Sequence, residues 1–240
     1  VEASRNISCV GAEPLAVTNN LNFSSPDNPI GYWQLALACR GLSKACTILE
    51  TPITGGNVSL YNETRLSNGK LQPIQPTPVV GMVGLVNDLE SICYQGWNEP
   101  KDSIWLLGIP IEVSNSLDSR ITLSATSYLE SIHGLLTGRP PEIDLNLEKL
   151  IQSFLRKSII DGFIKSAHDV SDGGIAISLA ESCISSGLGC HWNIPPSKAR
   201  LDRILFAEGG SRIIVSIPSQ KEVEWQLRLN QMKDKCQESL

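Results

Sequence analysis

The chain has 240 residues, of which 41% are hydrophobic, and its formal net charge is −5 at pH 7. This apolar content is enough for one packed core or two smaller ones, which excludes a disordered tail. The charge provides no basic excess that would attract phosphate backbones or anionic membranes, so neither nucleic acid nor membrane is an expected partner. The sequence holds no run of eighteen apolar residues and no basic-then-apolar leader at its start. These features predict a soluble, cytoplasmic protein.

The seven cysteines indicate free thiols rather than a metal or disulfide framework. They are scattered and odd in number, without C-x-x-C pairs, which favours a reducing compartment. Cys39 and Cys46 share a helical face with leucines, so we expect them to be small buried apolar residues. Cys190 beside His191 resembles half of a metal site, but no second pair has a usable spacing.

Apolar periodicity in the first part predicts, in chain order, a helix, a strand, a helix and two strands, over residues 1–9, 15–18, 32–50, 51–54 and 78–86. The first strand is short and buried, and it would deliver Asn19, Asn20 and Asn22 to its carboxyl end. The second strand runs directly into a Gly-Gly pair. Both short strands therefore end in residues that could bind a ligand.

Composition changes over residues 87–102, where Asn, Asp, Glu, Gly and Pro accumulate, and we place a domain boundary there. Beyond it the pattern predicts two strands, over 103–107 and 212–217, and four helices. The first helix ends near Gly134, the second has Asp144 as its N-cap, the third opens after residues 167–174 and ends at Gly187, and the last covers 222–240.

The order of elements predicts a mixed α/β (α+β) fold with two consecutive domains, residues 1–88 and 102–240. The chain opens inside a helix without a methionine, and its last helix stops without a cap. We therefore expect both domains to be truncated.

Two glycine-rich segments could bind an anion, because residues without Cβ let backbone N–H groups approach a ligand. Residues 55–59 (GGNVS) follow a strand and supply an amide oxygen and a hydroxyl, which suit a hard cation or a phosphate. The alternative is a turn whose polar groups satisfy only the local backbone.

The second segment, residues 168–174 (HDVSDGG), opens a helix whose N-terminus attracts negative charge. Asp172 could instead cap that helix. His168 could act in acid–base chemistry, or it could be a structural histidine held by a hydrogen bond, which we favour. Neither a G-x-x-x-x-G-K-[ST] loop nor a G-x-G-x-x-G fingerprint occurs, so a nucleotide site must have another design.

Several longer motifs resemble phosphoribosylformylglycinamidine synthase, in the synthetase (large) subunit of the multi-subunit form. They are GAEPLAVTNNLNF at 11–23, YWQL at 32–35, GGNVSLYNET at 55–64, PTPVVG at 76–81, AHDVSDGG at 167–174 and FAEGGSR at 206–212. Because they occur in the family's order over nearly the whole chain, the resemblance is specific.

The resemblance implies a fold like that of aminoimidazole ribonucleotide synthetase, repeated in two halves, each with a dimerisation-type domain and a second α/β domain. The chain looks like most of the second half. Residues 1–88 would be the later part of the domain that carries the nucleotide site, and residues 102–240 would be the second domain without its end.

The resemblance also implies an ATP- and Mg²⁺-dependent ligase. It would phosphorylate the formamide oxygen of formylglycinamide ribonucleotide, and ammonia would then displace phosphate to give formylglycinamidine ribonucleotide, ADP and phosphate in purine biosynthesis. The implied partners are a glutaminase subunit, a small accessory subunit and the first half of the same chain. The family's catalytic histidines lie in that first half, so we expect no catalytic residue here and no activity from this chain alone.

Carried over residue by residue, the resemblance assigns nucleotide contacts to Asn19 and Gly56, a magnesium ligand to Asn57 and a substrate contact to Ser59. Asn19 stands where the family has an aspartate, so a charge is missing and any metal contact through this position should weaken. Ser24 stands where the family has a glycine, so the local turn is expected to differ.

The counterpart of the loop with Glu208, Ser211 and Arg212 contacts substrate in the family's first half, and a structural role is equally open here. Two further alternatives also stay open. This half could be a structural nucleotide-binding module without chemistry, or the chain could belong to a related enzyme that makes selenophosphate or phosphorylates thiamine monophosphate. The long motif at 55–64 argues against the latter.

Overall fold

The computed structural model describes residues 1–111, 118–194 and 196–238, and it falls into two compact units. Unit 1 comprises Glu13–Leu85 together with Val1 and Ala3. Unit 2 comprises Glu2, Ser4–Ala12 and Val86–Leu240. The domain ranges 1–88 and 102–240 stay a prediction.

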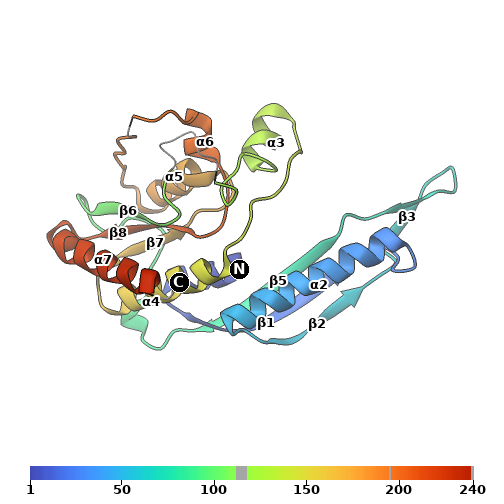
Figure 1. Ribbon diagram of the computed structural model, residues 1–240, viewed down its shortest axis with the longest axis horizontal. Helices are drawn as coiled ribbons and strands as arrows, with labels where there is room; N and C mark the ends of the chain where they lie inside the picture. Colours follow the sequence, from blue (N-terminus) through green and yellow to red (C-terminus); the bar gives the residue numbers. More distant parts are fainter. Residues whose placement is uncertain (112–117, 195, 239–240) are drawn as a thin grey trace. The chain divides into compact units, whose positions relative to one another are not determined.

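Unit 1 is a three-stranded sheet accompanied by one long helix (Figure 1). Its strands are β1 (Glu13–Asn22), β2 (Ile53–Ser59) and β5 (Thr77–Leu85), in the order β2-β1-β5. β1 pairs parallel with β2 and antiparallel with β5. Helix α2 (Pro29–Leu49) makes the crossover that two parallel strands require. A short hairpin of β3 (Glu63–Arg65) and β4 (Leu71–Pro73) follows β2.

Local signals fix both ends of α2. Asn28 is the N-cap, and its side chain accepts a hydrogen bond from the backbone N–H of Ile30 at 2.9 Å. Pro29 occupies the first helical turn, and Glu50 ends the helix in the left-handed conformation. The helix therefore starts three residues before its predicted start at 32.

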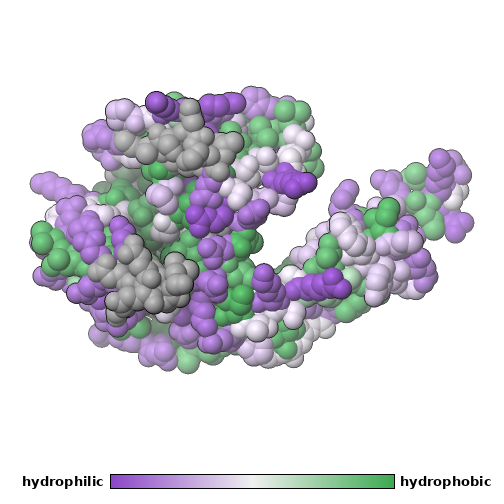
Figure 2. Space-filling model, in the orientation of Figure 1, coloured by the Kyte–Doolittle hydropathy of each residue, from purple (hydrophilic) through white to green (hydrophobic). Residues whose placement is uncertain are grey.

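The apolar side of α2 is only partly covered, so our prediction of a buried cysteine is wrong for Cys39. Cys39 is exposed and Cys46 is half-buried. Together with Leu42 they line an open groove of about 510 Å³, whose other wall includes Leu21 and Ile53. Hydrophobic side chains are visible on the surface of this unit in Figure 2. A periodic stripe predicts which face turns inward, but not how much protein covers it.

Unit 2 is built around a three-stranded antiparallel sheet in the order β6-β8-β7 (Ser103–Gly108, Arg212–Ile217 and Ser166–Asp169). Its helices are α1 (Glu2–Val10), α3 (Ser127–His133), α4 (Leu145–Ile160), α5 (Gly174–Ser186), α6 (Leu201–Phe206) and α7 (Glu222–Glu238), with 3₁₀ turns at Leu89–Ser91 and Ser219–Lys221. The predicted strands at 103–107 and 212–217 and the caps at Gly134, Asp144 and Gly187 are confirmed. Residues 239 and 240 of the last predicted helix lie outside the described part.

The central strand β8 is buried along its whole length and separates two apolar clusters. Ile213 and Val215 face a cluster that includes Leu155 of α4 and Trp225 of α7. The alternate residue Ile214 faces a second cluster with α5. Because strand side chains alternate between faces, this pattern makes unit 2 a sheet with helices on both sides. In the residues described, no helix has the length and apolar character needed to cross a bilayer.

Candidate functional site

The four site residues implied by the motifs lie on two neighbouring parallel strands of unit 1. In the register of β1 and β2, Asn19 is opposite Gly56 and Asn20 is opposite Asn57. Ser59 is the last residue of β2 and is opposite the last residue of β1. Parallel strands present their carboxyl ends at the same edge of a sheet, which is where ligands gather in such folds.

Residues 55–59 lie within a strand, which differs from our expectation that they follow one. β2 runs from Ile53 to Ser59, and the predicted short strand at 51–54 covers only its start. Residues 55–58 are exposed and Ser59 is half-buried, so no packed side chains cover them. The turn alternative for this segment is therefore wrong, since its backbone pairs with β1.

The backbone of Gly56 lies directly against the side chain of Asn19. A Cβ added at Gly56 would come well inside 3.0 Å of both the backbone oxygen and the Oδ1 atom of Asn19. A Cβ added at the neighbouring Gly55 would meet no atom within 4 Å. Position 56 therefore needs glycine to keep the Asn19 side chain in place, whereas position 55 does not.

Asn57 presents an oxygen that a hard cation could use. Its Nδ2 donates to the Oδ1 atom of Asn20 at 3.1 Å, which fixes the orientation of the amide. Among the residues that the structure describes, Asn57 Oδ1 accepts no hydrogen bond. Amide oxygens are ligands that Mg²⁺ and Ca²⁺ accept. The described residues include no group of three His, Cys, Asp or Glu side chains suited to a metal.

The hydroxyl of Ser59 is held by Asn62. Ser59 Oγ donates to Asn62 Oδ1 at 3.3 Å, and Asn62 Nδ2 donates to the backbone oxygen of Ser59 at 2.8 Å. A further bond from Asn62 Nδ2 to the backbone oxygen of Phe23, at 3.3 Å, connects this turn to the end of β1. The sequence analysis assigned a role neither to Asn62 nor to the contact between Asn20 and Asn57. Their positions in the Asn-Asn run at 19–20 and the Asn-Glu-Thr run at 62–64 were the features that could have indicated them.

Strand alternation divides the four residues between two faces of the sheet. Asn19 lines the groove beside α2 together with Leu21, and Gly56 lies against it. Asn57 is bonded to Asn20, which as the next residue of β1 points to the opposite face. In the described sheet β2 is an edge strand, so one ligand can reach both faces only around that edge.

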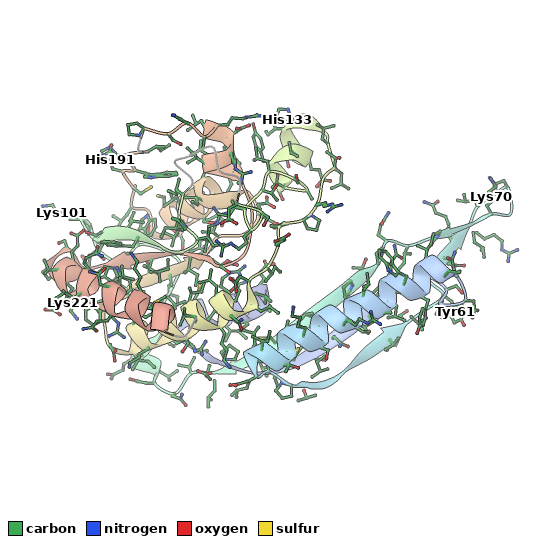
Figure 3. All side chains as sticks on the ribbon, in the orientation of Figure 1. Tyr61, Lys70, Lys101, His133, His191 and Lys221 are labelled. Carbon is green, nitrogen blue, oxygen red and sulfur yellow. The ribbon has the colours of Figure 1, made fainter. Side chains whose placement is uncertain are left out.

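Tyr61, which is labelled in Figure 3, lies two residues after the end of β2. The neighbouring Asp27 carboxylate raises the pKa of the Tyr61 phenol, mainly through its charge. Tyr61 is therefore a neutral hydrogen-bonding group at neutral pH.

In unit 2, His168 forms a hydrogen bond between its Nε2 and the Oε2 atom of Glu181, at 2.8 Å. This contact favours the structural alternative for the histidine. The alternative in which Asp172 caps the helix is wrong, because the N-cap of α5 is Gly173. Gly173 has a positive φ of 76°, which glycine adopts without strain, and the N-cap therefore lies one residue past Asp172 and the helix begins at Gly174.

Glu208 takes the capping role instead. Its Oε1 atom accepts hydrogen bonds from the backbone N–H groups of Gly173, at 2.8 Å, and Ser127, at 2.9 Å. Burial raises the pKa of Glu208, and these two N–H groups partly offset that effect. Ser211 donates to Glu148, and Arg212 donates to the backbone oxygen of Ala207 at 2.6 Å. All three residues of this loop are thus bonded within unit 2, as the structural alternative predicts.

Sequence profiles of the AIR synthase related proteins match most of the chain. The N-terminal domain of these proteins matches residues 1–86, and their C-terminal domain matches residues 99–235. The chain belongs to the AIR synthase related family. Membership confirms the predicted fold class, a mixed α/β fold with two consecutive domains.

The curated relatives described below are phosphoribosylformylglycinamidine synthase subunits, the family that the motifs resemble. The chain is 68% identical to the phosphoribosylformylglycinamidine synthase subunit PurL of Prochlorococcus marinus (strain MIT 9303), over 232 residues that make up 97% of this chain and 29% of the relative. It is 58% identical to the PurL of Thermosynechococcus vestitus, over 94% of this chain and 30% of that protein. The resemblance drawn from the motifs is confirmed, and the chain spans about three tenths of the length of these relatives.

Solved structures with the same fold include a PurL and a hydrogenase maturation protein. Thermotoga maritima PurL complexed with AMPPCP has a TM-score of 0.62 and 17% identity, over 95% of this chain and 33% of that one. The hydrogenase maturation protein HypE in complex with ATP also has a TM-score of 0.62, with 14% identity, over 97% of this chain and 64% of that one. At these identities the likeness shows the fold alone.

Proposed function

We propose that this chain is part of an ATP-dependent carbon–nitrogen ligase, a phosphoribosylformylglycinamidine synthase. The reaction converts formylglycinamide ribonucleotide, ammonia and ATP into formylglycinamidine ribonucleotide, ADP and phosphate. The 68% identity to a PurL subunit supports this assignment. Structures of T. maritima PurL complexed with ATP and with FGAR support the nucleotide and the substrate.

The pairing of β1 with β2 is the observation that supports the proposed roles of Asn19, Gly56, Asn57 and Ser59. Asn19 and Gly56 touch, and this close approach leaves backbone exposed where a nucleotide could lie. In the proposal these two residues bind the nucleotide. Asn57 binds the cation and Ser59 binds the substrate, both from the opposite face of the same edge strand.

The residues fit a magnesium ion in the proposal, because the Oδ1 atom of Asn57 is held in a fixed direction by its Nδ2 bond. Mg²⁺ is usually bound through one or two protein oxygens plus phosphate and water oxygens, so a single amide is a sufficient protein contribution. When bound, the ion offsets the negative charge on the transferring phosphoryl group. Phosphorylation turns the formamide oxygen, a poor leaving group, into one that ammonia can displace.

The remaining parts of the reaction are assigned to protein outside this chain. Because the chain spans 29% of its relative, we propose that the catalytic histidines belong to another part of the complete protein. Ammonia would come from a glutaminase subunit, with a small accessory subunit in the complex. The complete enzyme would act in the cytoplasm.

One residue favours a second candidate, in which this half binds a nucleotide permanently and performs no chemistry. Asn19 carries no charge where the family has an aspartate, so it contributes hydrogen bonds but little to holding a cation. In that case the β1–β2 edge would stabilise the active half of the enzyme. A substitution at the proposed cation ligand separates the two candidates.

The experiment is Asn57→Ala in the complete protein, with Asn68→Ala as the matched control. Asn68 lies in the β3–β4 turn, where its side chain accepts a bond from the backbone N–H of Lys70. We expect Asn57→Ala to lower turnover with ammonia by about 10²-fold or more at unchanged thermal stability, on the scale of losing one transition-state contact. A loss of folding with Asn57→Ala would support the structural candidate, and unchanged turnover in a folded variant would contradict the proposal.

A further inference from the structure

Asn62 uses all of its polar groups at the carboxyl end of β2. Its backbone N–H donates to the backbone oxygen of Phe23 at 3.2 Å, and its backbone oxygen accepts from the N–H of Ile74 at 3.0 Å. Its side chain is bonded to Ser59 and Phe23. Phe23 follows β1, Ser59 ends β2 and Ile74 follows β4. Asn62 therefore joins the ends of three strands and can fix the orientation of the groups around it.

The neighbours of the Asn62 amide determine which way it points. Its Nδ2 atom lies 2.8 Å from the backbone oxygen of Ser59 and 3.3 Å from that of Phe23. A backbone oxygen can only accept hydrogen bonds, so the amide nitrogen, and not the amide oxygen, must face these two atoms. The third neighbour of Nδ2 is the Oγ atom of Ser59, at 3.0 Å. The two shortest contacts of Nδ2, both to Ser59, match the number of its N–H groups.

This arrangement determines what the Ser59 hydroxyl can do. Because Oγ accepts a bond from Asn62, the hydroxyl keeps its own hydrogen to donate. Oδ1 of Asn62 can accept that hydrogen, but this contact is the longer one, at 3.3 Å. Hydrogen bonds to charged oxygens are shorter and stronger than a neutral contact of this length. An oxygen atom of a ligand can therefore take the hydrogen while the bond from Nδ2 to Oγ stays in place.

The residue before Asn62 is strained. Tyr61, which is labelled in Figure 3, has φ of 60°, in the left-handed region that bulky residues rarely adopt. Its side chain is exposed, so packing of the ring does not explain this conformation. Its N–H donates to the backbone oxygen of Ser24 at 3.4 Å, and the bonds of Asn62 hold the next residue. Strain of this kind persists where neighbouring contacts over-determine the backbone, and it gathers at binding sites.

We propose that Asn62 is a positioning residue for the substrate and acts through Ser59. Its amide nitrogen occupies one lone pair of Ser59 Oγ, which leaves the hydroxyl as a hydrogen-bond donor to an oxygen atom of formylglycinamide ribonucleotide. The inference rests on the proposed function, since it takes Ser59 as the substrate contact. It adds the direction of that hydrogen bond, the class of the partner atom, which is an acceptor oxygen, and the residue that sets both.

The alternative role for Asn62 is to stabilise the turn alone. Both roles predict that Asn62→Asp lowers stability, because carboxylate oxygens cannot donate to the backbone oxygens of Ser59 and Phe23. The two roles differ in substrate affinity. In the variant the Ser59 hydroxyl donates to the new carboxylate, and a substrate oxygen must compete with that charge-assisted bond. Positioning therefore predicts weaker substrate binding, whatever the stability of the turn.

The experiment measures the binding of formylglycinamide ribonucleotide and of ADP to the complete protein by isothermal titration, together with thermal stability. We expect Ser59→Ala and Asn62→Asp each to weaken substrate binding by about tenfold, on the scale of one hydrogen bond, and to leave ADP binding unchanged. Asn68→Asp is the matched control. It makes the same chemical change in the β3–β4 turn, where the side chain accepts a bond from the N–H of Lys70, as a carboxylate also can. This variant should bind both ligands like the wild type.

Two double variants separate positioning from stability. When Ser59→Ala is already present, Asn62→Asp should weaken substrate binding no further, because its effect passes through the Ser59 hydroxyl. Tyr61→Gly relieves the strained φ, so adding it to Asn62→Asp should raise thermal stability without restoring substrate affinity. If Asn62→Asp alone does not fold, the substrate affinities of Tyr61→Gly with and without Asn62→Asp give the same comparison. Recovery of both stability and affinity would overturn the positioning role.

The outcomes distinguish this inference from the proposed function. Substrate affinity that is unchanged in Asn62→Asp but lowered in Ser59→Ala would overturn the positioning role and leave the substrate contact intact. Unchanged substrate affinity in Ser59→Ala would overturn the contact itself and the inference with it. Fully additive losses in the double variant of Ser59 and Asn62 would show that Asn62 does not act through the Ser59 hydroxyl, which also contradicts the inference.

Discussion

Replacing Gly56 with alanine tests how the candidate site is built. The added Cβ would come well inside 3.0 Å of the backbone oxygen and the Oδ1 atom of Asn19, and 3.1 Å from the backbone nitrogen of the same residue. Two of these three atoms belong to the backbone of β1, so rotating one flexible side chain cannot relieve the clash. Either the β1–β2 pairing shifts or the Asn19 amide moves out of position.

Overpacking of this kind typically costs about 1–3 kcal/mol. Gly55→Ala is the matched control, because the same added methyl group would meet no atom within 4 Å. Its effect should stay within about 0.5 kcal/mol, as for most surface substitutions. The two adjacent glycines thus differ in what faces their missing Cβ, and of the two only Gly56 has a positive φ, of 159°.

The assay measures urea unfolding and ADP affinity for both variants in the complete protein. We expect Gly56→Ala to lower the free energy of unfolding by about 1–3 kcal/mol. It should also weaken ADP binding by about tenfold or more, because a loss of about 1.4 kcal/mol in binding free energy corresponds to a factor of ten in affinity. Gly55→Ala should bind ADP like the wild type. Equal stability and equal ADP affinity in the two variants would refute the role that we give to the Gly56–Asn19 contact.

Three further predictions concern the buried charges of unit 2 and the chain as a whole. Glu148→Ala should destabilise the fold by about 3–5 kcal/mol in chemical denaturation, because it leaves the buried Arg5 guanidinium without one of its two carboxylates; a loss below 1 kcal/mol would contradict this. Burial raises the pKa of Asp169 above its ordinary value of 3.8, and Arg5 only partly offsets this. The folded state therefore binds the extra proton, so the contribution of Asp169 to stability should fall as the pH rises from about 3.8 through the raised pKa. Asp169→Asn should make the fall in stability over this range shallower in urea melts, and an unchanged slope in the variant would refute the assignment. The purified 240-residue chain should show no turnover of substrate with added ammonia and ATP, and measurable phosphate release would show that catalytic groups lie within it.

Local signals in the sequence predicted element ends better than element extents. Gly134, Asp144 and Gly187 end or start helices as expected, because a cap depends on one residue and its immediate backbone. The predicted extent of β2 was wrong. A glycine pair within a sequence usually marks a turn, whereas here pairing with the neighbouring strand β1 keeps Gly55 and Gly56 extended. The short strand β7 and the helix α6 were missed for a related reason: four and six residues are too few to display a period.

For the site, the motifs named the residues but not their arrangement. The separation of Asn19 from Asn57 by the plane of the sheet follows from strand alternation, and it becomes visible only once both residues are known to lie in paired strands. The exposure of Cys39 was unpredictable from periodicity, because the stripe on α2 does not reveal how much protein covers it. Glu208 rather than Asp172 accepts the hydrogen bond at the start of α5. This contact joins residues that are far apart in the sequence, so local patterns do not predict it.

The edge formed by β1 and β2 binds a nucleotide together with a cation in our account, and the dependence of ADP affinity on Mg²⁺ tests this most directly. Isothermal titration of the complete protein, with and without Mg²⁺, should give an affinity gain of about tenfold, or 1.4 kcal/mol, in the wild type and in Asn68→Ala. Asn57→Ala should bind ADP with no gain from the ion. The same Mg²⁺-dependent gain in all three proteins would contradict the account.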